Sequence, residues 1–386
     1  MIKVKFLLHS TFRSNPAFEL IEQGNLNQQE LHALADLSKD PEFFGVFRRK
    51  DAATADSAKL AYKEVALLFY FLQNAGPLPH YFKSEYDDET NLTLARLVIE
   101  GIFEIEIENC FYSGFAAQDF IYESTEQVWD RRHPLSRMSS AAIQYAIQLN
   151  EADTISLTSK LYGYNTTPLF GTPANELDTF KEVEAFLKIG KNDPLTRELL
   201  KNWNKHEPDQ KFRWISWSRK QNKSHNARLS STYKIYISPV LEELPDVFDR
   251  AVRALTESNA FHFKIGMNRE GLLRPDKFVA YFTEFDHLSA AADRLHAVLK
   301  DHSAQGVPFT APLDASGMLS WGMDSATDEN LQHVERKSWR AKVTEKLAAS
   351  ISLAKTEKLS REERVDFVLK KMVLEGVNPL TWTAVL

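Results

Sequence analysis

Hydrophobic and polar positions follow a helical period through most of the first 200 residues. Two strongly apolar segments, residues 57–74 and 90–101, each end near a glycine, Gly76 and Gly101, as helices commonly do. Similar patterns predict further helices over residues 139–149, 153–161, 177–189 and 195–203. We therefore expect a mainly helical domain over residues 1–205, with a structural or recognition role.

One segment of this region alternates instead. Phe103, Ile105 and Ile107 are separated by glutamates and followed by Glu108-Asn109, a pattern that predicts a β-hairpin. The order helix, helix, hairpin is winged-helix-like. Such a module suits recognition of a peptide or a nucleic acid, and a purely structural role fits the same pattern.

The pattern changes after a break at HEPDQ, residues 206–210. Alternating apolar residues predict strands, and amphipathic stretches between and after them predict helices. The expected strands are residues 232–238, 261–266, 277–282 and 318–321, and the expected helices are residues 241–257 and one carrying Leu288, Ala291, Leu295 and Leu299. This order predicts an α+β domain over residues 206–330, with helices packed on a sheet. Charged amphipathic stretches within 335–375 predict a helical extension over residues 331–386.

The composition, with 43% apolar and 26% charged residues, is typical of a folded globular protein. A single cysteine, Cys110, excludes an intrachain disulfide framework and a cysteine-based zinc site, and it fits a reducing compartment. No run of 18 apolar residues predicts a membrane span. We expect a cytoplasmic location, although export by a specialised secretion system would leave no such mark. The net charge of −6 makes nucleic acid an unexpected partner for the molecule as a whole.

Local charge differs from the total. Residues 211–234 contain no acidic residue. The cations of this stretch are Lys211, Arg213, Arg219, Lys220, Lys223, Arg228 and Lys234. They repel one another, so an anionic ligand would compensate them, although a solvated basic loop is the simpler alternative.

Lys234 and Lys264 project from two of the predicted strands, among aromatic residues. Partial desolvation and neighbouring cations lower the pKa of a lysine toward the range in which its neutral amine can accept a proton. The alternative is that each stem lies along the surface while the ammonium reaches water.

Arg274 precedes Pro275, which restricts it to an extended backbone conformation. Its guanidinium is therefore held, and it offers a bidentate fork for phosphate. Asp276 either orients one of the cations or caps a turn. Lys277 follows at the start of the predicted third strand.

The order TYKIYIS, amphipathic helix, FHFKIG and RPDKFVAYF resembles the HopA-type effector family and the phosphoserine/phosphothreonine lyase domains of lanthipeptide biosynthesis. The resemblance covers residues 228–321, about a quarter of the chain. Lys234 and Lys264 lie 30 positions apart, a spacing similar to that of a histidine and a lysine in bacterial phosphothreonine lyase effectors. Residues 1–200 carry no comparable resemblance.

The resemblance implies β-elimination of phosphate from a phosphorylated serine or threonine, without metal or cofactor. It assigns Lys264 as the base and Lys234 as the acid. His225 and His262 are alternative acids, and His225 is preferred because we expect His262 to point to the opposite face of the sheet. The residues expected to hold the phosphate are Arg274, Arg228 and Lys277.

The expected partners are a phosphorylated peptide or protein and a kinase that supplies the phosphate. Two other functions use the same basic groove. One is a non-catalytic phosphopeptide-binding effector, and the other is a nucleic-acid-binding protein with Trp214 and Trp217 as a stacking platform.

Overall fold

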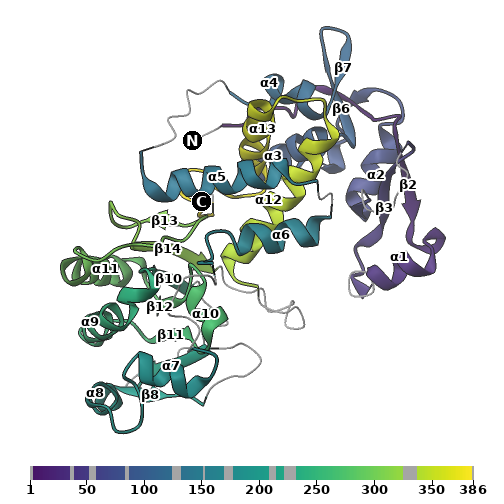
Figure 1. Ribbon diagram of the computed structural model, residues 1–386. Helices are drawn as coiled ribbons and strands as arrows, with labels where there is room; N and C mark the ends of the chain where they lie inside the picture. The colour runs from purple at the N-terminus through teal and green to yellow at the C-terminus, as the bar shows by residue number, and fades with distance from the viewer. Residues whose placement is uncertain are drawn as a thin grey trace. The chain divides into compact units, whose positions relative to one another are not determined.

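The computed structural model describes residues 3–34, 39–51, 58–82, 87–123, 132–150, 153–168, 177–207, 214–220, 232–324 and 337–384 (Figure 1). The chain forms two compact units. Unit 1 comprises residues 1–127 and 352–376, and unit 2 comprises residues 128–351 and 377–386. The predicted boundary near residue 205 therefore falls inside unit 2. The α+β class is confirmed, because helices and antiparallel sheets occur together.

Unit 1 contains two small antiparallel sheets with helices around them. The strand orders are β5-β1-β6-β7 and β2-β3-β4. The strands are β1 (Thr11–Ser14), β2 (Phe18–Glu22), β3 (Phe43–Arg49), β4 (Lys59–Tyr62), β5 (Gly76–Pro77), β6 (Phe103–Ile107) and β7 (Cys110–Tyr112). The α-helices are α1 (Gln28–Ala33), α2 (Lys63–Phe71), α3 (Asp87–Ile99), α4 (Gln118–Ile121) and α13 (Arg361–Leu374).

The predicted hairpin is confirmed as β6 and β7. Glu108 and Asn109 form its two-residue turn with φ angles of 51° and 64°. Positive φ at both central residues is the type I′ geometry that matches the twist of the flanking strands.

The expectation of a mainly helical N-terminal region is wrong for its first third. Residues 57–74 were expected to form one helix, but β4 occupies residues 59–62 and pairs with β3 before α2 begins at Lys63. β1, β2 and β3 were not predicted. Strand pairing is a long-range interaction, so a short apolar run next to a helix carries no local signal for it.

The predicted C-terminal extension is divided between the units. Its helix α13 belongs to unit 1, where Lys371 forms ion pairs with Glu100 of α3 at 3.1 Å and with Glu375 at 2.5 Å. Residues 377–384 belong to unit 2, where Trp382 packs edge-on against Phe309.

Unit 2 is built on a seven-stranded antiparallel sheet with the order β13-β14-β10-β12-β11-β9-β8. The strands are β8 (Trp203–Lys205), β9 (Trp214–Arg219), β10 (Thr232–Ile237), β11 (His262–Gly266), β12 (Phe278–Phe282), β13 (Ala311–Pro312) and β14 (Leu319–Asp324). The helices are α5 (Pro134–Gln148), α6 (Thr154–Tyr162), α7 (Phe180–Phe186), α8 (Pro194–Asn202), α9 (Leu244–Thr256), α10 (Arg269–Leu273), α11 (Phe285–Leu299) and α12 (Trp339–Thr356), the last of which ends in unit 1.

One face of this sheet forms the core of unit 2. Ile235, Phe263 and Phe278 point from β10, β11 and β12 into a cluster with Phe248 of α9 and Leu288 of α11. Figure 1 shows α9 and α11 side by side against the sheet. Because side chains alternate along a strand, residues one position away point to the opposite face. That face carries the lysines.

Among the residues that the structure describes, no helix is long and apolar enough to cross a membrane.

Candidate active site

The face of the sheet opposite α9 and α11 brings Lys234 and Lys264 together. Lys234 of β10 lies opposite Tyr281 of β12, and Tyr281 lies opposite His262 of β11. Lys264 is two residues beyond His262 and points to the same face. The two lysines are therefore diagonal neighbours on either side of β12, with Tyr281 between them.

Lys264 is held by aromatic rings alone among the described residues. Its Nζ lies 4.2 Å from the centroid of the Trp214 ring and 5.6 Å from that of Tyr281. No hydrogen bond or ion pair joins it to another described residue. Burial, reinforced by the charge of Lys234, lowers its pKa to about 8. At neutral pH an appreciable fraction of this amine is thus unprotonated, as the sequence analysis anticipated.

Lys234 has a different environment. Its ammonium forms an ion pair with Asp324 at the end of β14 and lies 5.4 Å from the Tyr281 ring centroid. Its side chain is only 6% exposed. A carboxylate partner favours the charged form of a lysine. The ion pair with Asp324 therefore holds the Lys234 side chain in place beside Lys264.

Arg274 is held in the extended conformation expected before Pro275, with φ −64° and ψ 148°. Its fork, however, is used by Asp276, with Nε–Oδ1 2.9 Å and Nη2–Oδ2 2.8 Å. Nη2 also donates to the Tyr162 hydroxyl at 3.0 Å. This fork was expected to bind phosphate. Among the described residues only Nη1 has no hydrogen-bond partner, so this end of the guanidinium is the one open to a ligand.

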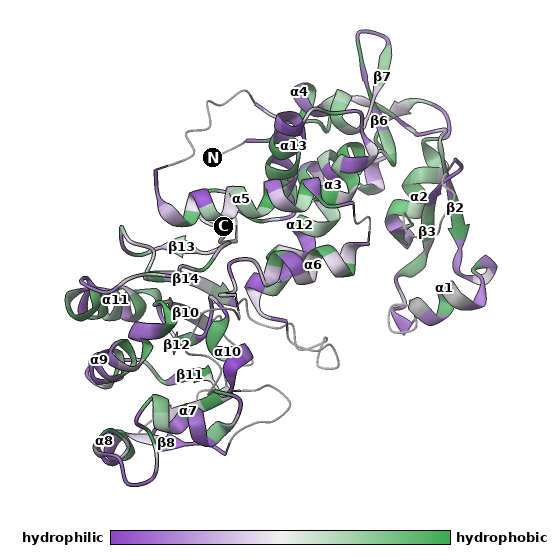
Figure 2. Ribbon diagram, in the orientation of Figure 1, coloured by the Kyte–Doolittle hydropathy of each residue, from purple (hydrophilic) through white to green (hydrophobic). Residues whose placement is uncertain are grey.

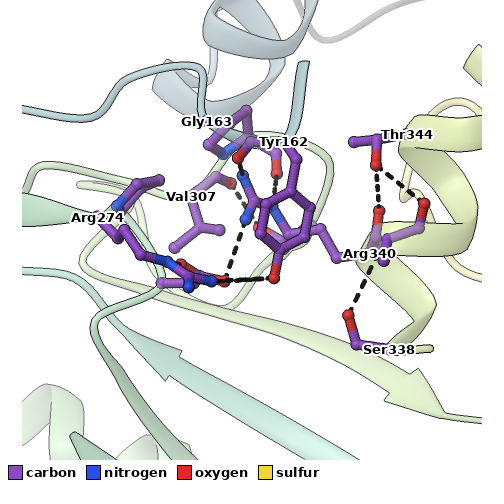
Figure 3. Close-up of polar contacts among 12 residues, drawn as sticks. Tyr162, Gly163, Arg274, Val307, Ser338, Arg340 and Thr344 are labelled. Atoms are coloured by element: carbon purple, nitrogen blue, oxygen red, sulfur yellow. Dashed lines mark hydrogen bonds and ion pairs between the residues drawn. The ribbon is translucent and has the colours of Figure 1, made fainter. Parts of the chain in front are cut away.

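Figure 3 shows Tyr162, Arg274 and Arg340 close together. The buried carboxylate of Asp276 bonds to all three of them. The Tyr162 hydroxyl donates to its Oδ2 at 3.0 Å, and Arg340 Nη1 lies 3.1 Å from the same oxygen. Burial alone would raise the pKa of Asp276, but Arg340 and Arg274 outweigh it and hold the pKa well below its usual range. Asp276 thus orients a cation, which was one of its two expected roles.

Arg340 ties this network to two other segments. Its Nη2 donates to the carbonyl of Tyr162 at 2.6 Å, and its Nε donates to the carbonyl of Pro308 at 3.1 Å. The guanidinium also lies 4.4 Å from the Tyr162 ring centroid. The residue is 1% exposed. Its donors are directed toward the protein interior, so Arg340 holds Asp276 and Tyr162 in position and does not face the open surface.

The electrostatic balance of this face favours an anion. Aromatic rings alternate with cations in the order Lys234, Tyr281, Lys264, Trp214 and Arg274. When Lys264 is protonated, four cations, Lys234, Lys264, Arg274 and Arg340, face two carboxylates, those of Asp276 and Asp324. A phosphate dianion would compensate the excess of positive charge.

His262 was expected to point away from the lysines, and this is wrong. It lies on the same face as Lys264, with its ring centroid 5.2 Å from that of Tyr281. Burial, helped by the charges of Lys264 and His206, lowers its pKa to about 4. His262 is therefore a neutral imidazole at neutral pH.

Lys277 does not reach the open surface of this face of the sheet. It is fully buried, and its ammonium donates to the carbonyl of Pro239 at 2.9 Å and to the side-chain oxygen of Gln305. Burial lowers its pKa to about 7. Through these contacts Lys277 joins the segments that carry Pro239 and Gln305, which is a structural role.

Two further candidates, His225 and Arg228, lie outside the described residues. Within the basic stretch, Arg219 donates to the carbonyls of Leu255, Thr256, Ser258 and Ala260 around the end of α9. Trp217 is stacked on Phe263 in the core. The proposed nucleic-acid platform of Trp214 and Trp217 is therefore wrong, since the two rings belong to opposite faces of the sheet.

Several residues of the site were not predicted from the sequence. Tyr281 could have been named as a candidate, because alternation places it on the same face of the predicted strand 277–282 as Lys277. The register then sets it opposite Lys234 and diagonal to Lys264. Asp324, Tyr162 and Arg340 had no local signal. They reach the site from β14, α6 and α12, and only the tertiary fold places them there.

The fold and site define an α+β protein with a cationic, aromatic-lined centre on an antiparallel sheet. No protein-family model matches the chain, and no curated protein matches it. Parts of the chain are similar to solved structures. The effector protein from Pseudomonas syringae pv. tomato strain DC3000 is 11% identical, with a TM-score of 0.39 over 66% of this chain and 98% of that one. The effector protein from Pseudomonas syringae pv. syringae strain 61 is 12% identical, with a TM-score of 0.38 over 64% and 97%.

The type III effector and phosphothreonine lyase OspF from Shigella flexneri is 17% identical, with a TM-score of 0.27 over 44% of this chain and 90% of that one. The two Pseudomonas proteins are effectors, and the Shigella protein is both an effector and a phosphothreonine lyase. A place in lanthipeptide biosynthesis stays a prediction.

Proposed function

We propose that unit 2 is a phosphoserine/phosphothreonine lyase that removes phosphate from a peptide or protein by β-elimination. The observation that carries the proposal is the pairing of Lys264, whose amine has a lowered pKa and no ionic partner among the described residues, with a fixed cation at Lys234. A base next to an anion site is what this elimination requires.

In the proposed reaction, the neutral amine of Lys264 removes the Cα proton of the phosphorylated residue. The electron pair of the C–H bond forms the Cα=Cβ double bond as the Cβ–O bond breaks. The electrons of the breaking bond leave with the phosphate. The products are a dehydroamino acid and phosphate, and the Lys264 ammonium returns its proton to solvent.

Lys234 is the better acid on this face. Asp324 keeps its amine charged and oriented, so it can donate to the leaving phosphate oxygen or neutralise it. A histidine whose pKa is about 4 is unprotonated at neutral pH and has no proton to give as an acid, which argues against His262. His225 stays an expectation, as does Arg228 in phosphate binding.

Arg274 would hold the phosphate through Nη1, the end of its guanidinium that Asp276 leaves open. The Trp214 ring contacts both cations, with its centroid 4.2 Å from the Lys264 Nζ and 5.4 Å from the Arg274 guanidinium carbon. The proposed base and the proposed phosphate-binding cation therefore lie beside one aromatic ring.

Phosphothreonine and phosphoserine peptides incubated with the protein test the proposal. We expect a mass loss equal to phosphoric acid and an alkene that a thiol traps. Lys264→Ala should slow elimination by about 10²- to 10⁴-fold, the usual contribution of a general base. It should leave phosphopeptide affinity within a few-fold of that of the unaltered protein. Lys300→Ala, an exposed lysine at the end of α11, is the matched control and should leave the rate unchanged.

Two outcomes would contradict the assignment. Binding without turnover by the unaltered protein, across a varied peptide set, would identify a phosphopeptide-binding protein in place of a lyase. Loss of binding and turnover together in Lys264→Ala would show that Lys264 holds the phosphate and is not the base.

A further inference from the structure

Helix α2 of unit 1 is apolar on almost its whole circumference, but only one side of it is covered. Ala66, Leu68 and Phe69 are buried in the unit. On the other side Leu67 and Phe71 are each 54% exposed and Tyr70 is 46% exposed. Figure 2 shows the hydrophobic colouring of α2.

The spacing of the exposed residues makes them one surface. Leu67, Tyr70 and Phe71 stand at positions i, i+3 and i+4, so they are neighbours on a single helix face. Phe44 of β3 extends this face, with its ring centroid 6.4 Å from that of Tyr70. Single exposed apolar residues are ordinary, whereas a contiguous group marks an interaction site. We call these four residues the α2 face.

Carboxylates border the α2 face. Glu22 accepts a hydrogen bond from the Tyr70 hydroxyl at 3.1 Å, and Glu64 lies in the first turn of α2. Both are exposed, and neither forms an ion pair with another residue that the structure describes. Glu42 is nearby too, but it is paired with Lys63 at 3.9 Å. The border therefore offers two negative charges to a ligand.

The charge of unit 1 as a whole has the same sign. Its residue ranges contain 17 lysines and arginines against 25 aspartates and glutamates, a net charge of −8. A second copy of this unit placed on the α2 face would meet like charge. A basic partner would meet opposite charge, which speeds association and favours the correct orientation.

We propose that the α2 face docks an amphipathic helical segment of a partner protein, with apolar residues on one side and lysines or arginines at its edges. Its apolar side chains cover Leu67 and Phe71, and its cations pair with Glu22 and Glu64. Helix-in-groove recognition by anchors at i, i+3 and i+4 uses the same physical chemistry. The proposal does not depend on the activity of unit 2.

The test uses the full-length protein and a fluorescein-labelled peptide of about 18 residues, long enough for several helical turns, with leucines on one side and lysines along both edges. A twin peptide carries glutamate in place of every lysine. Fluorescence anisotropy at low and high salt gives both affinities. We expect the lysine peptide to bind at least about tenfold more tightly than its twin, with an affinity that falls as salt rises.

Three variants locate the binding. The double variant Leu67→Ser with Phe71→Ser should lower the affinity for the lysine peptide at least about tenfold. Its thermal midpoint of unfolding should stay the same, because both side chains are already exposed. The double variant Glu22→Gln with Glu64→Gln should lower the affinity for the lysine peptide and make that affinity less dependent on salt. Ile155→Ser, which changes an apolar residue that is 79% exposed in unit 2, should have no effect.

A charge-matched control excludes unspecific attraction. Glu106→Gln with Glu108→Gln removes two carboxylates from the β6–β7 hairpin of the same unit and should leave binding unchanged. Equal binding of the twin peptide, no binding of the lysine peptide, or equal weakening by this control pair would overturn the proposal. Self-association of the unaltered protein that is lost in Leu67→Ser with Phe71→Ser would identify a second copy as the occupant instead.

Discussion

Arg340 and Asp276 form a buried ion pair, with 3.1 Å between Nη1 and Oδ2, although 64 positions separate them in the chain. Asp276 in turn holds both Nε and Nη2 of Arg274. A residue of α12 therefore fixes the direction of a cation on the open face of the sheet. Arg340 is a positioning residue, since its own donors point to the protein interior.

Removing Arg340 should leave Asp276 buried with less compensation. Breaking a buried pair by removing one partner costs about 3–5 kcal/mol of the free energy of unfolding. We expect Arg340→Leu to lower stability by that order in urea denaturation. Asp276→Asn together with Arg340→Leu should lose less than the sum of the two single variants, because the double variant removes both members of the buried pair and leaves only Arg274, which is 33% exposed, without its carboxylate.

The variant Arg340→Lys separates the role of Arg340 in orienting Arg274 from its contribution to stability. It keeps the charge but not the planar fork that reaches Tyr162 and Pro308. We expect it to recover much of the lost stability, while KM for a phosphopeptide stays raised because Arg274 is no longer held in one direction. Full recovery of both quantities would show that Arg340 acts through its charge alone.

Changes at Arg274 should act on phosphate binding. Arg274→Lys removes the contacts to Asp276 and Tyr162 that orient the charge. We predict a rise in KM of about tenfold or more, in line with the strength of a charge-assisted hydrogen bond. Tyr162→Phe keeps the ring and removes one hydrogen bond to Arg274, so its effect should be smaller. Equal KM values for Arg274→Lys and the unaltered protein would contradict this role.

The pKa of Lys264 predicts how its reactivity depends on pH. Its pKa of about 8 means that the neutral amine increases roughly tenfold per pH unit up to that point and then levels off. Elimination should follow the same curve. Lys234 lowers this pKa, so Lys234→Met should move the midpoint to higher pH.

Acylation of Lys264 by an amine-reactive reagent, followed by peptide mass spectrometry, measures this midpoint even in a variant without turnover. Lys300 serves as an internal exposed reference. A midpoint near the ordinary lysine value of about 10.4, or one that Lys234→Met leaves in place, would refute the assignment.

Lys277 should make stability rise with pH. Its folded pKa is about 7 and its ordinary value is 10.5, so between these values the unfolded chain holds a proton that the folded protein lacks. The unfolding free energy therefore increases with pH across this window, and Lys59 and Lys264, each with a pKa of about 8, add to the slope. Lys277→Met should reduce the slope by up to about 1.4 kcal/mol per pH unit. Denaturation at a series of pH values checks this, and an unchanged slope would disprove it.

Local patterns were sufficient for many elements. The periodicity around Val247 and Leu288 predicted α9 and α11, and the alternation around Phe103 predicted the hairpin. They failed for β4, β9 and the first strands of unit 1, whose partners are distant in sequence. A strand buries its apolar side chains only once its neighbours are in place, so a short run near a helix or in a basic stretch gives no decisive local signal.

The sequence by itself determined that Lys234 and Lys264 sit on strands, that Arg274 is extended before Pro275, and that these cations have few acidic neighbours in the chain. Strand alternation and the geometry of proline are local properties, so they can be read from the order of residues. Only the tertiary structure decided that Lys264 lies between Trp214 and Tyr281, that Lys277 is buried, and that Asp324 and Arg340 complete the site. Ion pairs and burial depend on which distant segments meet, and that is settled by packing of the whole unit.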